Sequence, residues 1–508
     1  MKNRFMKEKF GIFLTFIFMP SSFSSCMDNS NMTDLNPVLP TNIAGDDSGD
    51  SDGRSGSSGD QTAKFPSFPG EGIAFPGAEG YGRKAAGGRE NGEIYHVTNL
   101  NDAGKGSFRD AVSKSYRIIV FDVAGIIRLG SDPVVLKSNQ TILGQTAPGD
   151  GIVLYGGRVS ASGANNTIVR YLRIRMGAAY SKQADACGIA NGSDIIFDHC
   201  SITWGKDENF SVNSDGKGVR PHNITIQNSI IGQGLQNHSC GGLIQTDETE
   251  GVTIYRNLYI DNKTRNPKVK GLNQFVNNVL YNWGNGAAYN MGGESEGASE
   301  TTIENNYFIV GEGGNWMDDG TGAIVFSYVN PSRPFTGGNA LFRTFFSGNY
   351  YDKNKDGVLN GIEITPENWN ENCSGNPTFL PERSSLHPTI SGISSAKNAY
   401  DWIVKNVGAS LPARDEVDTY LISELTSLGT KGVIIRNETK TEQFPLGGPG
   451  LIAHGEKALD SDNDGIPDAF EIKWNLDKDD PSDATKIASN GYSNIENYTF
   501  SLEFPEYY

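Results

Sequence analysis

The sequence predicts an all-β protein that winds into a right-handed, single-stranded parallel β-helix and ends in a small C-terminal segment. Two observations carry this prediction: short β-branched runs recur along the chain, and a small polar residue recurs at the same place within them. A third is the composition, with 62 glycines among 508 residues and a modest apolar fraction of 37%. Such a chain suits many short strands and turns better than long helices.

The repeated runs are "NTIVRYLRIR", "SDIIFDHCSIT", "HNITIQNSII", "GVTIYRNLYI", "NQFVNNVLYN" and "TTIENNYFI". Their alignment puts Cys200, Asn228, Asn257, Asn278 and Asn306 at one equivalent position, with separations of 28, 29, 21 and 28 residues, and Asn349 is a candidate further member. Amide side chains stacked in this way can form a ladder of hydrogen bonds, one per coil. Each unit has too little apolar surface to fold alone, so stacking must bury a continuous core. The strands of a β-sandwich would return every ~8–12 residues, which the spacing disfavours.

The N-terminus, residues 1–26, has the composition of a targeting segment. "MKNRFMKEKF" is basic, "GIFLTFIFMP" is apolar but too short to span a bilayer well, and "SSFSSC" ends in Cys26. This end resembles the lipobox of bacterial lipoproteins, in which the cysteine is lipidated; a plain signal peptide is the alternative. In both cases we expect the protein to be exported, either as an outer-membrane or cell-surface lipoprotein or as a secreted protein. Any contact with the membrane is expected only through the N-terminal lipid.

The rest of the chain divides by composition. Residues 27–70 are rich in Ser, Gly and Asp and predict a flexible linker. The β-helix is expected over 71–440 and the C-terminal segment over 441–508. Within the former, "SAKNAYDWIVKNVG" has apolar residues at helical spacing, and we expect this helix to pack on the β-helix or to extend it. The remaining cysteines, Cys187, Cys200, Cys240 and Cys373, are expected to be mostly buried free thiols, in a monomeric protein.

The formal net charge of −17 argues against nucleic acid as a partner. Within this acidic chain, "DNKTRNPKVKG" (261–271) gathers Lys263, Arg265, Lys268 and Lys270 around Pro267. A cationic loop of this kind suits an acidic substrate, and an ordinary basic surface turn is the alternative reading.

"RNPKVK" matches the R-x-P-x-x-R pattern of the pectate lyases of polysaccharide lyase family one, with Lys270 in place of the last arginine. "IIFDHCSITWGKDENFSV", "FPGAEGYGRKAAGGR", "VTNLNDAGKGSFRDAV" and "FDVAGIIRL" also resemble segments of that family, and the resemblance covers roughly residues 73–350. It implies calcium-dependent cleavage of polygalacturonate, the acidic polymer of plant cell-wall pectin. The cleavage would proceed by β-elimination and give 4,5-unsaturated oligogalacturonides.

The resemblance also implies roles for the basic residues. Arg265 takes the position of the catalytic base, although arginine is normally protonated and needs nearby cations to make its neutral form accessible. Lys268 and Lys270 would bind substrate carboxylates. The place of the family's substrate lysine is occupied here by Cys240, and His238 or Lys268 is expected to substitute.

The Ca²⁺ ligands implied by the resemblance are oxygens on adjacent coils. Asp185 and Asp207 stand where the family has two acidic ligands. Ser211 replaces the third carboxylate, and Glu208 is the residue that compensates.

Two further stretches satisfy the twelve-residue calcium-loop spacing of EF-hands, in which glycine makes the sharp turn and the last glutamate reaches back to the ion. The first loop supplies Asp460, Asp462, Asp464, Asp468 and Glu471. The second supplies Asp352, Asn354, Asp356, Asn360 and Glu363. Paired flanking helices are not evident, so both are interpreted as isolated structural Ca²⁺ loops, with a polar turn as the alternative.

Other functions remain open at this stage. A pectin lyase would act on methylated polymer without metal, against which Asp185 and Asp207 argue. A polygalacturonase would need a cluster of aspartates acting as acid and base, which the pattern lacks. The alternative that is not an enzyme is a non-catalytic surface glycan-binding β-helix. The replacement of the family's substrate lysine by Cys240 leaves this alternative open.

Overall fold

The structure is a computed structural model that describes residues 63–68, 73–284, 286–292 and 298–508. The predicted signal peptide with Cys26, and most of the predicted linker, lie outside the described residues. Within the described part, none of the helices combines the length and the apolar character that crossing a lipid bilayer requires. Cys187, Cys200, Cys240 and Cys373 are buried and free of disulfides, as expected.

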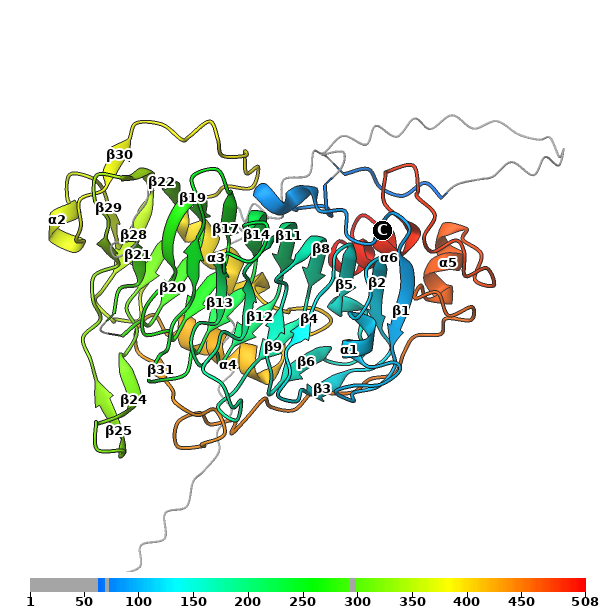
Figure 1. Cartoon of the computed structure of the whole chain (residues 1–508), viewed down its shortest axis with the longest axis horizontal. Coiled ribbons are helices and arrows are strands. Elements are labelled where there is room, and N and C mark those ends of the chain that lie inside the picture. The colour runs from blue at the N-terminus through cyan, green and yellow to red at the C-terminus, as the bar shows by residue number, and fades with distance from the viewer. Residues whose placement is uncertain (1–62, 69–72, 285, 293–297) are drawn as a thin grey trace, which may run out of the picture. The chain divides into compact units, whose positions relative to one another are not determined.

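The chain visits three faces in turn and repeats the circuit coil after coil. Each strand pairs in parallel with the equivalent strand of the next coil, so that β2 pairs with β5, β5 with β8 and β8 with β11 (Figure 1). This is the predicted right-handed parallel β-helix, and the fold prediction is confirmed.

Face A contains β1 (Glu93–Val97), β2 (Arg117–Phe121), β5 (Gln140–Leu143), β8 (Ala164–Arg170), β11 (Gly192–Asp198), β14 (His222–Gln227), β17 (Val252–Tyr255), β19 (Lys268–Val276), β22 (Ser299–Glu304), β27 (Phe342–Ser347) and β30 (Thr378–Leu380). Face B contains β3 (Gly125–Arg128), β6 (Ile152–Tyr155), β9 (Arg173–Arg175), β12 (Ser201–Thr203), β15 (Ile230–Gly232), β18 (Leu258–Ile260), β20 (Val279–Tyr281), β23 (Tyr307–Ile309), β28 (Asn349–Asp352) and an antiparallel end strand, β29 (Ile362–Ile364). Face C contains β4 (Val134–Val135), β7 (Val159–Ser160), β10 (Cys187–Ile189), β13 (Phe210–Asn213), β16 (Leu243–Gln245), the start of β19, β21 (Tyr289–Met291) and β26 (Phe335–Gly337).

The asparagine ladder forms at the corner between faces A and B, with one correction to the predicted alignment. Nδ2 of Asn257 donates to Oδ1 of Asn278 at 3.1 Å, and Asn278 and Asn306 continue the series as far as Asn349. On the preceding coil, however, the ladder position is held by Ser229, whose backbone N–H donates to Asn257 Oδ1. Asn228 stands one residue earlier, in the left-handed corner conformation with φ 54°, and donates to Asp198 instead.

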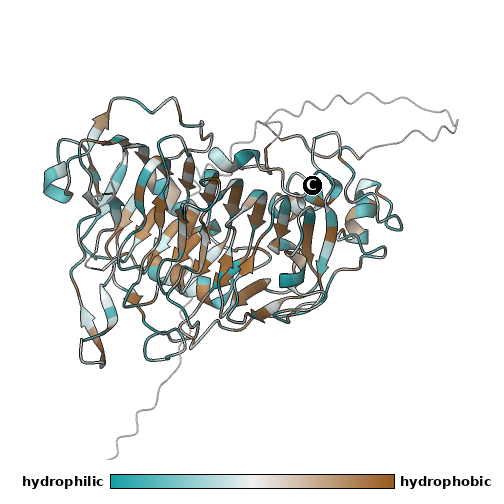
Figure 2. Cartoon of the chain, in the orientation of Figure 1, coloured by the Kyte–Doolittle hydropathy of each residue, from teal (hydrophilic) through white to brown (hydrophobic). Residues whose placement is uncertain are grey.

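The core lies between the three faces. Alternate strand residues such as Ile195, Phe197, Ile224 and Ile226 point inward and are fully buried in one continuous cluster. Hydrophobic residues accordingly gather on the stacked strands (Figure 2). This burial across coils is the main stabilising term expected for a repeat fold.

After β30 the chain turns back along face B. The predicted helix is confirmed as α3 (Ala396–Asn406), which packs against β20 and β23, and α4 (Glu416–Leu425) follows it. Two elements extend away from the coils as a hairpin, β24 (Gly314–Asp318) and β25 (Ile324–Tyr328), and β31 (Val433–Ile434) pairs with β24. Short helices α1 (Phe108–Ala111) and α2 (Trp369–Asn372), and 3₁₀ turns η1 (Tyr81–Lys84) and η2 (Gly144–Thr146), complete this part.

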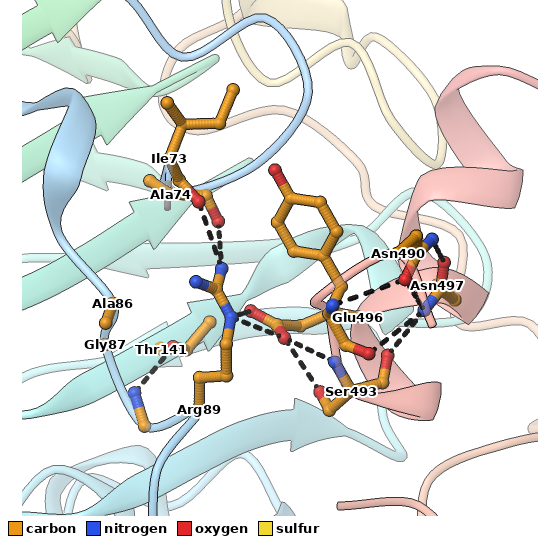
Figure 3. Close-up of polar contacts among 12 residues, drawn as sticks. Ile73, Ala74, Ala86, Gly87, Arg89, Thr141, Asn490, Ser493, Glu496 and Asn497 are labelled. Atoms are coloured by element: carbon orange, nitrogen blue, oxygen red, sulfur yellow. Dashed lines mark hydrogen bonds and ion pairs between the residues drawn. The ribbon is translucent and has the colours of Figure 1, made fainter. Parts of the chain in front are cut away.

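The C-terminal helices α5 (Asp468–Trp474) and α6 (Asn494–Glu503) pack on the first coils. Ile466 and Ile495 share a buried cluster with Ile118 and Val120 of β2. Arg89 binds Glu496 of α6 at 3.0 Å and donates to the carbonyl of Ala74, which ties the helix to the start of the domain (Figure 3). Phe65, inside the predicted linker, is also buried there against Phe470 and Trp474.

Two buried arginines on β9 form ion pairs with residues at the start of α4 and thereby hold this helix against face B. Arg175 donates to both oxygens of Asp415, at 2.6 and 3.0 Å, and to Asp418 at 2.9 Å. Arg173 lies 3.5 Å from Asp415, and all four side chains are fully buried. Burial opposes ionisation of Asp415, but Arg175 and Arg173 outweigh it and lower its pKa to about 2.

Replacing Asp415 by alanine is therefore expected to lower the free energy of unfolding by about 3–5 kcal/mol, because it leaves two buried guanidinium groups with Asp418 as their remaining carboxylate partner. Chemical denaturation of the variant and of the parent measures the difference. Asp401→Ala, at an exposed position of α3, is the control, and an equal effect of both substitutions would contradict the account.

Candidate active site

The residues singled out from the sequence come together just before the strands of face C. Asp185 precedes β10, Asp207 and Glu208 precede β13, and Arg265 precedes β19. Isolated parallel bridges join Glu208 to Cys240 and Cys240 to Thr264, so successive coils remain in register outside the strands. Residues distant in sequence are thereby stacked in a column.

An acidic cluster forms the centre of this column. Asp185, Asp207 and Glu208 each offer a carboxylate oxygen, and these oxygens lie within 4.8 Å of one another. Glu208 is buried, and burial together with the charges of Asp185 and Asp207 raises its pKa to about 7. Three crowded oxygen donors whose charges repel one another fit a hard cation such as Ca²⁺.

Arg265 faces this cluster. Its Nη1 forms an ion pair with Oε1 of Glu208, and its side chain is 27% exposed. Burial disfavours the guanidinium charge, but Cys240, Glu208 and Asp207 outweigh burial and raise the pKa of Arg265. The ion pair connects the proposed base directly to one of the proposed metal ligands.

His238 lies at the rim of the cluster rather than on an open surface. Its Nε2 is 3.0 Å from Oδ1 of Asp207, and both side chains are partly exposed. Hydrogen bonding to Asp207 and to Cys240 raises the pKa of His238 to about 10, while the same contact lowers that of Asp207. The structure thus places His238 where it orients a carboxylate.

Lys268 and Lys270 stand on β19 beside this column. Val269 between them points into the core and is fully buried, so the two lysines lie on the other side of the strand. There Lys268 is also buried, at 6% exposure, whereas Lys270 is partly exposed. Lys268 aligns with Leu243 of the preceding coil and Lys270 with Gln245. Ser211, on the same side, uses its hydroxyl to accept the N–H of Leu243 and stays outside the acidic cluster.

A cationic pocket that the sequence did not predict borders the site. It has a volume of about 320 Å³ and is lined by Lys206, Asn237, Arg436 and Lys440 among others. Arg436 donates to Oδ1 of Asn237 at 2.8 Å, and Lys206 to the carbonyl of Tyr180 at 2.6 Å. No local pattern could reveal this pocket, because Arg436 and Lys440 reach it through the returning C-terminal chain.

The predicted loop at 352–363 does not gather its carboxylates. Asn354 donates to Asp356 and Asn360, and Asp352 accepts the N–H of Asn360. Glu363 lies on β29 opposite Tyr350 with an exposed side chain. Within the described residues, Asp352, Asp356 and Glu363 do not form a cluster of three carboxylates. The structure brings Asn354, Asp356 and Asn360 together without Glu363, and the calcium loop here stays a prediction.

Fold and site together define a class of protein: a parallel β-helix with an arginine facing acidic side chains that come from neighbouring coils. No protein-family model matches the chain. It is 48% identical over 430 residues to probable pectate lyase C of Neosartorya fischeri, and equally to that of Aspergillus fumigatus, covering 85% of this chain and 94% of each relative. The Emericella nidulans relative of the same name is 46% identical over 437 residues, covering 86% and 94%.

Among solved structures, a thermostable pectate lyase matches with 15% identity and a TM-score of 0.45, over 65% of this chain and 97% of its own. A pectate lyase bound to a hexasaccharide matches with 15% identity and a TM-score of 0.43, over 69% and 99%. The fungal relatives decide the assignment: the chain belongs to the pectate lyase family.

Proposed function

We propose that the protein cleaves polygalacturonate by Ca²⁺-dependent β-elimination at the site around Arg265. The observation that supports this most directly is the ion pair between Arg265 and Glu208, whose carboxylate lies in one cluster with those of Asp185 and Asp207. A cation-binding group and a basic side chain are thereby close enough to act on the same sugar residue.

The reaction needs a base at C5 of a galacturonate unit. Removal of the C5 proton supplies the electron pair for the new C4–C5 double bond, and the C4–O bond breaks so that the glycosidic oxygen leaves and takes up a proton. Asp185, Asp207 and Glu208 would hold the metal. When bound there, Ca²⁺ supplies positive charge that neutralises the uronate carboxylate and makes the C5 proton more acidic.

Arg265 is the proposed base. Its carboxylate neighbours favour the protonated guanidinium. Once their charge is balanced, the neutral form becomes more accessible, and Lys268 and Lys270 on the adjoining strand act in the same direction. Lys270, which is partly exposed, also offers positive charge to the carboxylates of the polymer, whereas Lys268 is buried and would add its charge from below the surface. Lys206, Arg436 and Lys440 line a further cationic pocket.

Two alternatives remain to be separated from this proposal: a pectin lyase acting on methylated polymer, and a glycan-binding β-helix without activity. The discriminating experiment measures ultraviolet absorbance of unsaturated uronide on polygalacturonate and on highly methylated pectin, each with Ca²⁺ or with chelator. We expect signal on polygalacturonate with Ca²⁺ and its loss with chelator. Activity on methylated pectin that survives chelator favours the first alternative, and binding without any signal favours the second.

We further propose export of the protein, as the composition of residues 1–26 suggests. We also propose lipidation at Cys26, with an outer-membrane or cell-surface location, and this proposal is based on the sequence alone. The assignment to polysaccharide lyase family one and the monomeric state are likewise proposed from the sequence. The named relatives are fungal and lend no weight to a bacterial lipoprotein.

A further inference from the structure

The loop before α5 brings several carboxylates together, including one that the twelve-residue spacing did not predict. Oxygens of Asp460, Asp462 and Asp464 lie within 4.8 Å of one another. Asp464 also belongs to a second group of the same closeness, with Glu471 from α5 and Asp483 from the following turn. Four carboxylates therefore converge around that of Asp464, which makes five in all, and Gly465 makes the sharp turn in the loop with φ 90°.

Several of these oxygens are buried without any hydrogen-bond partner in the described structure. Glu471 is fully buried, and neither of its carboxylate oxygens has a partner. Oδ2 of Asp464 and Oδ1 of Asp483 are likewise buried and unpartnered, as are both oxygens of Asp462. An ionised carboxylate buried in this way is strongly destabilising unless a positive charge accompanies it.

The fifth acidic residue of the predicted loop behaves differently. Asp468 accepts hydrogen bonds from the backbone N–H and the hydroxyl of Ser461, both at 2.7 Å. It closes the loop on itself instead of joining the cluster, and its role as a ligand stays a prediction. Asp483, which the spacing rule could not identify, takes a place in the cluster.

The geometry points to a structural Ca²⁺ site formed by Asp460, Asp462, Asp464, Glu471 and Asp483, separate from the active site. Oxygen-only donors at flexible spacing suit Ca²⁺ better than Mg²⁺, which demands a near-ideal octahedron. Lys457 lies 3.2 Å from Asp460 and the charge of Lys486 acts on Asp483, but two ammonium groups at the edge cannot balance five carboxylates.

This site lies where the C-terminal chain packs on the start of the β-helix. Ile466 belongs to the loop that forms the site, and Ala484 follows Asp483 directly. Both pack with Ile118, Val120 and Leu143 of the first coils. An ion held by the loop, by α5 and by the 483 turn thus fixes the returning C-terminal chain on the start of the β-helix. Because binding favours only the folded form, it stabilises that form by mass action.

The test uses the full chain and Ca²⁺ itself as the probe. Bound Ca²⁺ per chain is measured after desalting, and the thermal midpoint is measured with Ca²⁺ and with chelator. Glu471→Gln and Asp462→Asn are expected to lose one equivalent of Ca²⁺ and most of the upward shift that Ca²⁺ gives the parent. Turnover per folded molecule in Ca²⁺ should stay unchanged. Asp479→Asn, at an exposed acid nearby, should resemble the parent.

Asp462 is only partly buried, so we expect Asp462→Asn to fold. This variant can be measured even if Glu471→Gln fails to fold. Parental Ca²⁺ content and an unchanged thermal shift in Asp462→Asn would overturn the site. Loss of Ca²⁺-dependent turnover with an unchanged thermal shift would overturn its structural role and assign the loop to the substrate cleft. If the proposed catalytic function is wrong but the structural site is right, the parent will show no Ca²⁺-dependent turnover. Its Ca²⁺ content and its thermal shift will still change in the variants as predicted here.

Discussion

Arg265→Lys is expected to lower turnover on polygalacturonate by about 10³-fold or more, while polymer binding and the thermal midpoint stay close to those of the parent. A positioned general base contributes roughly 10²–10⁴-fold. Lysine keeps the positive charge but not the planar fork that pairs with Glu208, nor the reach of the guanidinium. Initial rates from ultraviolet absorbance and binding of polygalacturonate measure the two effects separately.

Lys263→Gln is the matched control, because Lys263 belongs to the same basic loop but is not among the residues that face the acidic cluster. We expect it to retain a rate near that of the parent. A near-native rate in Arg265→Lys would remove Arg265 from the role of base and leave the basic loop with substrate binding alone.

The second large effect concerns the acidic cluster. Asp185→Asn and Glu208→Gln are each expected to raise the Ca²⁺ concentration for half-maximal activity by at least about tenfold, since losses of this size follow even from changes outside the first ligand shell. The amide keeps the shape of the side chain but removes the charge that attracts the cation. Ca²⁺ titrations of the initial rate give the shift directly.

Asp215→Asn serves as the control for these titrations, because Asp215 is an exposed acid close to the same coil. If the Asp185 and Glu208 variants respond to Ca²⁺ as the parent does, the catalytic cation binds elsewhere on the β-helix.

The coil repeat could be predicted from sequence, but not its exact register at every coil. Asparagine suits both the left-handed corner and the ladder position that follows it. At Asn277–Asn278 the chain has an asparagine at both places, whereas at Asn228–Ser229 the corner has the asparagine and the ladder has serine. An alignment by residue type therefore shifts by one position, and only the strand pairing between coils resolves it.

The return of the chain along face B was not predictable from local patterns. Arg173 and Arg175 lie in a strand-like run, and nothing near them indicates that their partners come from α4. The same holds for the pocket near the candidate active site, since Arg436 reaches it only after this return. Long-range ion pairs leave no periodic signal in a single sequence.

The two calcium-loop motifs show how far spacing alone can predict a site. Both satisfy the same twelve-residue rule. The loop at 352–363 joins two antiparallel strands, and Glu363 lies opposite Tyr350 with an exposed side chain. The loop at 460–471 leads into α5, whose first turn brings Glu471 back toward Asp464. The two loops thus differ in the element that follows them, a strand in one and a helix in the other, which the twelve-residue spacing does not specify.

The central claim is that the site around Arg265 cleaves by elimination. Mass spectrometry of the oligosaccharides released from polygalacturonate in Ca²⁺ tests it most directly. Elimination adds no water, so each new non-reducing end should be lighter by one water than the end that hydrolysis would give, and this product should disappear in Arg265→Lys. Released ends that carry the added water, or unsaturated ends formed at parental rate by Arg265→Lys, would contradict the account.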